Sequence, residues 1–236
     1  MEPAEKRLLI ALDYPDPVQA KNMVAELAPL GVGFKVGLEL YMAGGPEFVK
    51  ELALKHRIFL DLKFHDIPNT VAGAVKQAAS LGVWMVNVHA SGGRAMLKAA
   101  LQALSGSGNN RPLLFAVTVL TSLNEQDLAE TGCLVDLDEK VQKLTNLALE
   151  CGFDGVVCSP LEVASIKRNI PGSFLTVTPG VRPAGTDRKD QFRTATPGEI
   201  IRSGGDYLVV GRPVTRAEDP ASAVRNIIQE MGLGDE

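Results

Sequence analysis

The sequence has few cysteines and no long apolar run. There are 3 cysteines, an odd number, and no two have the spacing of metal ligands: Cys133, Cys151 and Cys158. We therefore expect reduced thiols in a cytosolic protein. No apolar run reaches the ~20 residues that a membrane-spanning helix requires. The first residues lack a basic segment followed by a long apolar one, so we expect no signal peptide, no membrane partner and a cytoplasmic location.

The sequence also lacks an excess of positive charge. Its 24 Lys and Arg residues against 28 Asp and Glu residues give a net charge of −4, with no basic stripe. This argues against a nucleic-acid partner. No GxGxxG segment follows the first apolar run, which argues against a dinucleotide-binding fold. An acidic chain can still bind a phosphate ester, provided that it concentrates its cations locally.

Short apolar runs alternate with stretches of helical period along the chain, which is 45% apolar. The expected strands are Leu8–Leu12, Phe34–Leu38, Ile58–Leu62, Trp84–Val88, Leu113–Val119, Gly155–Cys158, Phe174–Val177 and Tyr207–Val210. The expected helices are Pro17–Leu27, Pro46–Lys55, Val71–Leu81, Arg94–Leu104, Leu137–Glu150, Leu161–Asn169, Pro197–Ser203 and Pro220–Met231. This alternation is typical of parallel strands joined by helices. Eight such units in 236 residues, with no linker between them, predict a single (β/α)₈ TIM-barrel domain over residues 1–236.

Polar side chains gather where the expected strands end, which is where barrel enzymes place their catalytic groups. They are Asp13, Lys35, Asp61, Lys63, His65, Asp66, Asn87, His89, Thr118, Thr121, Ser122, Arg182, Gly211 and Arg212. Cys158, also at a strand end, is expected to be a packing residue, because no base is identifiable beside it. His89 is expected to satisfy a hydrogen bond near the barrel mouth.

The segment FLDLKFHDIPNT carries the strongest signal of this group. Side chains alternate along a strand, so Asp61 and Lys63 are expected on one side, with Lys35 facing them from the neighbouring strand. Buried charges are costly unless paired, so the pattern predicts a linked charge array. Flanking carboxylates favour the ammonium form of Lys63, which suits a proton donor and not a Schiff-base nucleophile. A purely structural salt-bridge network is the alternative.

A second signal is phosphate binding after the last two expected strands. The segments TPGVR and VGRP place Gly211 and Arg212 where barrels often hold phosphate, and glycine lets backbone N–H groups approach an anion. The long segment Gly180–Thr196 is interpreted as a lid that closes over the phosphate. An ordinary turn and a disordered surface loop are the alternatives.

Eight segments in the right order, running nearly end to end, resemble one known family. They are LLIALD, GFKVGLEL, FLDLKFHDIPNT, VNVHASGG, AVTVLTS, VVCSP, TPGVRP and VVGRPVT. The chain resembles the orotidine 5′-phosphate decarboxylases of the shorter bacterial type. The resemblance implies cofactor-free conversion of orotidine 5′-phosphate to UMP in de novo pyrimidine synthesis, without a metal, by a homodimer with shared active sites.

The resemblance also implies roles for individual residues. The catalytic set is Lys35, Asp61, Lys63 and Asp66, with Lys63 protonating C6 of the pyrimidine. Asp66, Ile67 and Thr70 are expected to enter the partner subunit's site. The remaining substrate contacts, besides Lys35 and Asp61, are implied to be Asp13, Thr121, Ser122, Pro179, Arg182, Gln191, Gly211 and Arg212, of which Arg182, Gln191, Gly211 and Arg212 bind the phosphate.

Two other functions stay open at this point. One is a barrel decarboxylase or epimerase that acts on a sugar phosphate with a metal; Lys35 argues against it, because such a relative would more naturally carry a carboxylate there. The other is a non-catalytic protein that binds phosphoribosyl ligands, since fold alone does not establish activity. The intact set of Asp61, Lys63 and Asp66 argues against mere binding.

Overall fold

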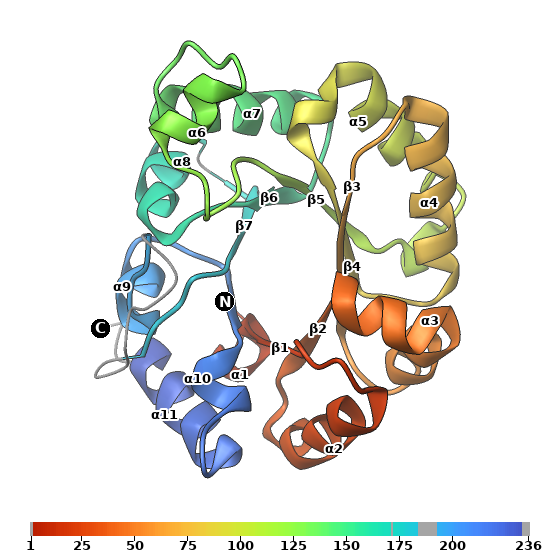
Figure 1. The fold of residues 1–236 in the computed structure, drawn as a ribbon, viewed down its shortest axis with the longest axis vertical. Helices are drawn as coiled ribbons and strands as arrows, with labels where there is room; N and C mark the ends of the chain where they lie inside the picture. Colours follow the sequence, from red (N-terminus) through yellow and green to blue (C-terminus); the bar gives the residue numbers. More distant parts are fainter. Residues whose placement is uncertain (1, 171, 184–192, 233–236) are drawn as a thin grey trace.

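The computed structural model describes residues 2–170, 172–183 and 193–232. Eight parallel strands close into a barrel in the order β1-β2-β3-β4-β5-β6-β7-β8. The helices form a ring outside the strands (Figure 1). The (β/α)₈ fold expected from the sequence is therefore confirmed.

The strands are β1 Leu8–Ala11, β2 Gly33–Gly37, β3 Ile58–Phe64, β4 Met85–His89, β5 Leu113–Val117, β6 Gly155–Val157, β7 Leu175–Thr178 and β8 Tyr207–Val210. The α-helices are α1 Ala4–Arg7, α2 Pro17–Leu27, α3 Leu38–Ala53, α4 Pro68–Ser80, α5 Gly93–Gln102, α6 Glu125–Glu130, α7 Leu137–Glu150, α8 Val163–Asn169, α9 Pro197–Arg202, α10 Arg212–Thr215 and α11 Pro220–Gly232. Short 3₁₀ turns are η1 Ala28–Leu30, η2 Ala90–Gly92, η3 Gly108–Asn110 and η4 Pro160–Glu162.

Two apolar cores hold the barrel together. The larger fills the space between strands and helices, and the nearly all-apolar strands supply it because they are covered on both faces. The smaller cluster fills the barrel interior with Leu9, Ala11, Phe59, Met85, Phe115, Val117, Val157, Val177, Tyr207 and Val209. The strand register aligns Ala11 with Lys35 and Lys35 with Phe59, so Lys35 projects into the same interior above this cluster.

Besides the short helices α1 and α10, which were not expected, and shifts of up to three residues at element ends, the structure differs from the expected elements at two places. Leu38, expected to end a strand, instead begins α3, which continues past a kink at Gly45 and Pro46. Gly45 has a φ of 70°, a conformation that glycine adopts readily, so the two halves follow one another without strain. The stretch Asn124–Asp136, in which none of the expected helices lies, contains α6. An Asn124 N-cap with Asp127 at its third position forms a capping box there.

Candidate active site

A chain of alternating charges crosses the carboxyl ends of β1, β2 and β3. Lys35 Nζ lies 2.6 Å from Asp13 Oδ1 and 3.9 Å from Asp61 Oδ2. Lys63 Nζ lies 2.7 Å from Asp61 Oδ1. The structure thus brings together Lys35, Asp61 and Lys63, as the charge-array prediction expected, and joins Asp13 to them. Each ammonium has at least one carboxylate partner, which offsets the cost of holding these charges partly out of water.

The backbone at Lys63 does not follow the strand alternation that the sequence argument used. Lys63 has a φ of 52°, and among the described residues it is the one non-glycine residue with positive φ. The pairing of β3 with β4 also shifts register between Leu60 and Phe64. The backbone thus departs from regular alternation at Lys63, and the Lys63 ammonium still meets Asp61. A positive φ at a lysine is strained, and such strain persists only where the surroundings enforce it.

Asn87 on β4 is the side chain that enforces this conformation. Its Oδ1 accepts a hydrogen bond of 2.8 Å from the Lys63 backbone N–H, and its Nδ2 donates one of 2.7 Å to Asp61 Oδ1. The side chain is 0% exposed. A single buried amide therefore fixes the backbone of the lysine and the carboxylate of its partner. Asn87 was expected at a strand end, but no role was predicted for it. An Asn between two valines of a buried strand was the signal that could have indicated one, because a buried amide needs hydrogen-bond partners.

Gly37 leaves the space in which Lys35 and Asp13 meet. A Cβ atom at this position would lie 3.0 Å from Lys35 Nζ and 3.6 Å from Asp13 Oδ1. Its register partner on β3 is Asp61, so the glycine sits directly beside the charge chain. At Gly211, after β8, an added Cβ would lie 3.7 Å from Asp13 Oδ2. The ends of β8 and β1 therefore meet at this aspartate.

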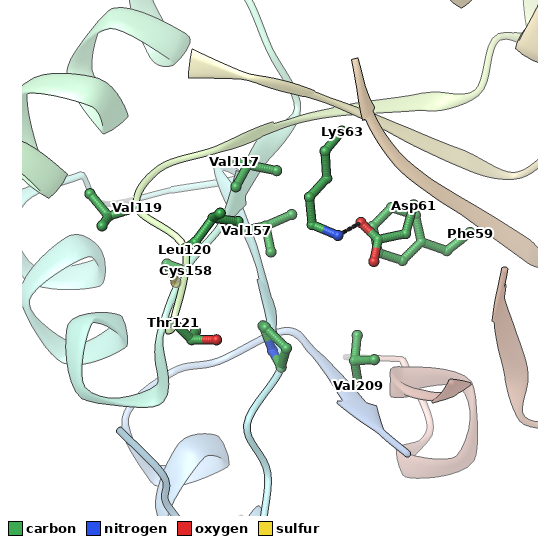
Figure 2. A pocket seen from close by; sticks show the side chains of 11 residues that line it. Phe59, Asp61, Lys63, Val117, Val119, Leu120, Thr121, Val157, Cys158 and Val209 are labelled. Atoms are coloured by element: carbon green, nitrogen blue, oxygen red, sulfur yellow. Dashed lines mark ion pairs between the residues drawn. The ribbon is translucent and has the colours of Figure 1, made fainter. Parts of the chain in front are cut away.

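A cavity of about 140 Å³ opens beside Asp61 and Lys63. Figure 2 shows the Lys63 ammonium directed at the Asp61 carboxylate, with Val117, Val157 and Val209 around the same space. Its other lining residues are Phe59, Val119, Leu120, Thr121, Cys158 and Pro179. One charged wall facing apolar walls suits a flat ring that packs on its faces and carries a charged reacting group.

Two titratable groups near this cavity favour their neutral forms. Burial, with the charges of His65 and Lys63, lowers the pKa of His89, whose ring lies 5.3 Å from that of His65. Burial raises the pKa of the Cys158 thiol well above its usual value, and Glu162 adds to this shift. Cys158 is therefore a packing group in the cavity wall, as the sequence suggested. Cys133, Cys151 and Cys158 are all free thiols.

Several of the predicted site residues lie outside this cavity. Asp66, Ile67, Thr70 and Ser122 are exposed, and Asp66 Oδ1 accepts a hydrogen bond of 2.6 Å from Ile67 N. Thr121 and Pro179 line the cavity itself.

The residues predicted to bind phosphate follow β7 and β8. Arg182 donates from its backbone N–H to Ala195 O over 2.9 Å, which joins the two ends of the Gly180–Thr196 segment. Gly211 caps α10, and Arg212 is its first residue and is exposed. Gln191 and the middle of the predicted lid lie outside the described residues, so the structure leaves both predictions open.

Two features are absent from the described part of the chain. No group of three or more His, Cys, Asp and Glu side chains there has an arrangement that could hold a metal ion. Within the same residues, no helix has both the length and the apolar composition needed to cross a bilayer.

Comparison with known proteins gives one family. The model of the orotidine 5′-phosphate decarboxylase / HUMPS family matches residues 6–227. An orotidine 5′-phosphate decarboxylase from Psychromonas ingrahamii is 52% identical over 224 residues, which cover 94% of this chain and 96% of the relative. One from Nitrosomonas europaea is 51% identical over 228 residues, covering 96% and 97% of the two chains.

Solved structures agree with this result. A crystal structure of orotidine 5′-phosphate decarboxylase from Lactobacillus acidophilus has a TM-score of 0.86 and 40% identity, covering 96% of this chain and 99% of the other. One from Pyrococcus horikoshii has a TM-score of 0.77 at 21% identity, which supports the fold alone. The chain therefore belongs to the orotidine 5′-phosphate decarboxylase / HUMPS family.

Proposed function

We propose that the protein decarboxylates orotidine 5′-phosphate to UMP, the reaction that completes UMP formation in de novo pyrimidine synthesis. The observation that carries this proposal is the Lys63 ammonium, paired with Asp61 at 2.7 Å and placed on the wall of a cavity whose other sides are mainly apolar. Relatives with about half of their residues identical, over nearly the full chain, carry the same enzyme name. The cytoplasmic location expected from the sequence remains a prediction.

Loss of CO₂ from C6 of the pyrimidine leaves an electron pair in a ring orbital with no adjacent electron sink. The Lys63 ammonium stabilises this developing negative charge and then donates a proton to C6. Its neighbours position it beforehand: Asp61 holds the ammonium and Asn87 holds the backbone. Little reorganisation is then needed in the transition state, which is where electrostatic catalysis gains most.

One ion pair does not supply the whole rate enhancement. Two unit charges ~4 Å apart interact by about 4 kcal/mol at an effective dielectric of 20. Enzymes commonly lower activation barriers by about 8–23 kcal/mol. The remainder comes from binding energy at parts of the substrate remote from C6, used to align and desolvate the reacting group. Repulsion between Asp61 and the substrate carboxylate contributes in addition.

The phosphate is the natural source of that remote binding energy. Arg182 and Arg212 supply guanidinium groups after β7 and β8, and Gly211 supplies a backbone N–H. Guanidinium groups bind phosphate with paired, charge-assisted hydrogen bonds. With Gln191, these residues form the proposed phosphate site. Asp13 and Lys35 contact the ribose hydroxyls, Thr121 a ribose or interface group, Ser122 the pyrimidine amide, and Pro179 the ring.

The active unit is proposed to be a homodimer in which Asp66, Ile67 and Thr70 enter the partner's site. Exposed apolar side chains support an interface at this edge of the barrel. Ile67 is 66% exposed and Met42 80%, and Leu38 lies one helical turn before Met42 on α3. These residues follow the neighbouring strands β2 and β3. A second copy would remove them from water and complete the charge array with a further carboxylate.

The test is a turnover assay with orotidine 5′-phosphate, in which the fall in the ultraviolet absorbance of the substrate is measured over time. The reaction should proceed at an unchanged rate in the presence of excess metal chelator, with UMP and CO₂ as the products. Absence of turnover would refute the proposed function. Activity that disappears with chelator and returns with a divalent cation would instead favour a metal-dependent relative in the family.

A further inference from the structure

Arg193 is a buried cation that the proposed mechanism does not use. It lies where the segment after β7 returns to the barrel, two residues before Ala195, whose carbonyl accepts the Arg182 N–H at 2.9 Å. Val181 and Ala195 also form an isolated β-bridge. The two ends of this segment are therefore joined side by side, and Arg193 belongs to the joined part.

The Arg193 guanidinium connects this part to two other loops. Its Nη1 is hydrogen-bonded to Glu162 Oε1, and its Nη2 donates to the Leu120 carbonyl over 3.0 Å. The other carboxylate oxygen of Glu162 accepts the Ser159 N–H at 2.9 Å. Arg193 is 9% exposed and Glu162 only 4%. One side chain thus joins the loops that follow β5, β6 and β7.

All three loops contribute walls of the cavity beside Lys63. Leu120 and Thr121 follow β5, Cys158 follows β6 and Pro179 follows β7, and each lines the cavity. A planar guanidinium with several fixed donors can hold several acceptors in one arrangement, which a lysine ammonium on a flexible stem does less well.

We infer that Arg193 is a positioning residue for the decarboxylation: through Glu162 and the Leu120 carbonyl, it holds the loops after β5, β6 and β7 in one arrangement around the cavity. The inference rests on the proposed function. Arg193 contacts no reacting group and acts through the placement of Leu120, Thr121 and Pro179. A misplacement of about 1 Å far from the chemistry can cost ~10²-fold in rate.

The competing explanation is that Arg193 only stabilises the fold. The energetics of buried ion pairs allow an experiment to distinguish this role from positioning. Replacing both partners of such a pair by neutral groups of similar volume is often neutral for stability, whereas removing one leaves an unpaired buried charge. Burial already raises the pKa of Glu162, although the Arg193 charge opposes the shift, so an unpaired Glu162 would be costly. Within the described residues, the buried Arg193 Nε has no hydrogen-bond partner, which adds to the cost of burying this guanidinium.

The decisive variant is the double substitution Glu162→Gln with Arg193→Met. The amide oxygen of the introduced glutamine can still accept the Ser159 N–H, so the variant should fold with a melting temperature near that of the wild type. We expect kcat/KM for orotidine 5′-phosphate to fall by about 10-fold or more, mainly in kcat, because the Leu120 carbonyl loses its donor. Arg193→Lys keeps the positive charge but loses the planar, multi-donor guanidinium. Its kcat/KM should lie between those of the wild type and the double variant.

A matched control is the Arg111–Asp154 pair at the amino ends of β5 and β6. Asp154 bonds Arg111 Nη1 at 3.0 Å and accepts the Leu114 N–H at 2.7 Å, as Glu162 does for Ser159. The double variant Arg111→Met with Asp154→Asn should keep kcat/KM within about 2-fold, since this pair lies at the end of the barrel opposite the cavity. Wild-type kcat/KM in both the folded Glu162/Arg193 double variant and Arg193→Lys would overturn the inference.

Amide hydrogen exchange separates this inference from the proposed function. In the Glu162/Arg193 double variant, exchange should accelerate at the Arg182 amide and over residues 119–123, with the global unfolding free energy unchanged. If the wild type fails to decarboxylate orotidine 5′-phosphate but these amides still respond, the proposed function fails and the loop connection stands. Unchanged exchange at these amides would refute the connection itself, whatever the substrate.

Discussion

At the scale of single residues, the site depends on one lysine whose backbone and side chain are fixed separately. Asp61 pairs with the ammonium, and Asn87 accepts the backbone N–H at a positive φ. Neither contact alone determines where Nζ lies, because a lysine has four flexible side-chain torsions. The double restraint is what allows a flexible side chain to act as a preorganised proton donor.

Replacing the proposed donor tests this arrangement most directly. We expect Lys63→Ala to lower kcat by about 10³-fold or more, because both charge stabilisation and protonation at C6 are lost. UMP affinity, measured by calorimetry, should change little. Lys143→Ala, which removes a surface lysine paired with Glu139, is the control and should leave kcat unchanged. Near-normal turnover by the Lys63 variant would rule out the assigned role.

Removing the buried amide should damage the site without removing any charge. Asn87→Ala leaves the Lys63 N–H without its acceptor and removes one of the two donors to Asp61 Oδ1, the other being Lys63 Nζ, which costs about 1–3 kcal/mol of stability. The relaxed backbone should also lower kcat by about 10- to 100-fold. Denaturant unfolding and steady-state kinetics measure the two effects. Asn169→Ala, which loses an exposed bond to Gln142, is the control; equal effects of both variants would contradict the role of Asn87.

At the scale of elements, two strands carry glycine at positions where a side chain would collide with neighbouring atoms. Gly37 on β2 makes room for the Lys35–Asp13 pair, and Gly155 on β6 makes room for the Phe115 ring inside the barrel. These positions fix the spacing of neighbouring strands through the interior, since the register aligns Gly155 with Phe115. The site therefore depends on interior packing several residues below it.

A methyl group at Gly155 should not fit. Its Cβ would lie 2.2 Å from the Leu175 carbonyl oxygen, a backbone atom that is unable to move without disturbing β7. Gly155→Ala should therefore destabilise the protein by about 1–3 kcal/mol or more in denaturant unfolding. Gly106→Ala, where nothing lies within 4 Å, should change stability by less than about 0.5 kcal/mol. Equal stability of the two variants would argue against the packing seen in the barrel.

The His65–His89 ring pair, between the ends of β3 and β4, predicts a pH dependence. The pKa of His89 is lowered in the folded state below its usual 6.5, so the unfolded chain binds the proton more readily. Its contribution to stability is therefore present above pH 6.5 and is lost as the pH falls through 6.5 toward the folded pKa. Urea unfolding of wild type and His89→Gln at several pH values measures this. The wild type should lose more stability below pH 6.5 than the variant; parallel curves would contradict it.

At the scale of the whole molecule, the charge chain lies at one end of a closed barrel, and three predicted site residues do not line its cavity. Asp66, Ile67 and Thr70 are exposed on the loop after β3 and the start of α4. An exposed carboxylate and an exposed isoleucine beside a site are explained if a second copy receives them. Under the proposed homodimer, a second copy of the chain would supply these residues to the site.

Subunit mixing tests the shared site. Lys63→Ala chains exchanged with Asp66→Ala chains should regain activity, because each mixed dimer contains one site with both residues intact. Random exchange predicts recovery of about a quarter of wild-type activity. A mixture of Lys63→Ala with Asp61→Ala should stay inactive, since both residues belong to one chain's site. No recovery in the first mixture, with exchange shown by mass spectrometry, would place Asp66 outside the partner's site.

The sequence by itself determined the barrel and the presence of the charge array. Alternating apolar runs and helical periods are local patterns, and short strands covered on both faces leave a readable signature. Asp61 and Lys63 are two residues apart, so local spacing predicted that they could meet, although the backbone at Lys63 departs from regular strand alternation. Boundaries near Leu38 and Asn124 were less accurate, because a helix start depends on caps and kinks that propensity describes poorly.

Only the tertiary structure decided which distant residues hold the site in place. Asn87 reaches Asp61 and Lys63 across 26 and 24 residues of sequence, and Arg193 reaches Leu120 across 73. No local pattern encodes such contacts, because they arise when separate strands pair and bring their carboxyl ends together. The physical reason is that spacing along the chain fixes neighbours within an element, whereas pairing of strands in the sheet fixes neighbours between elements.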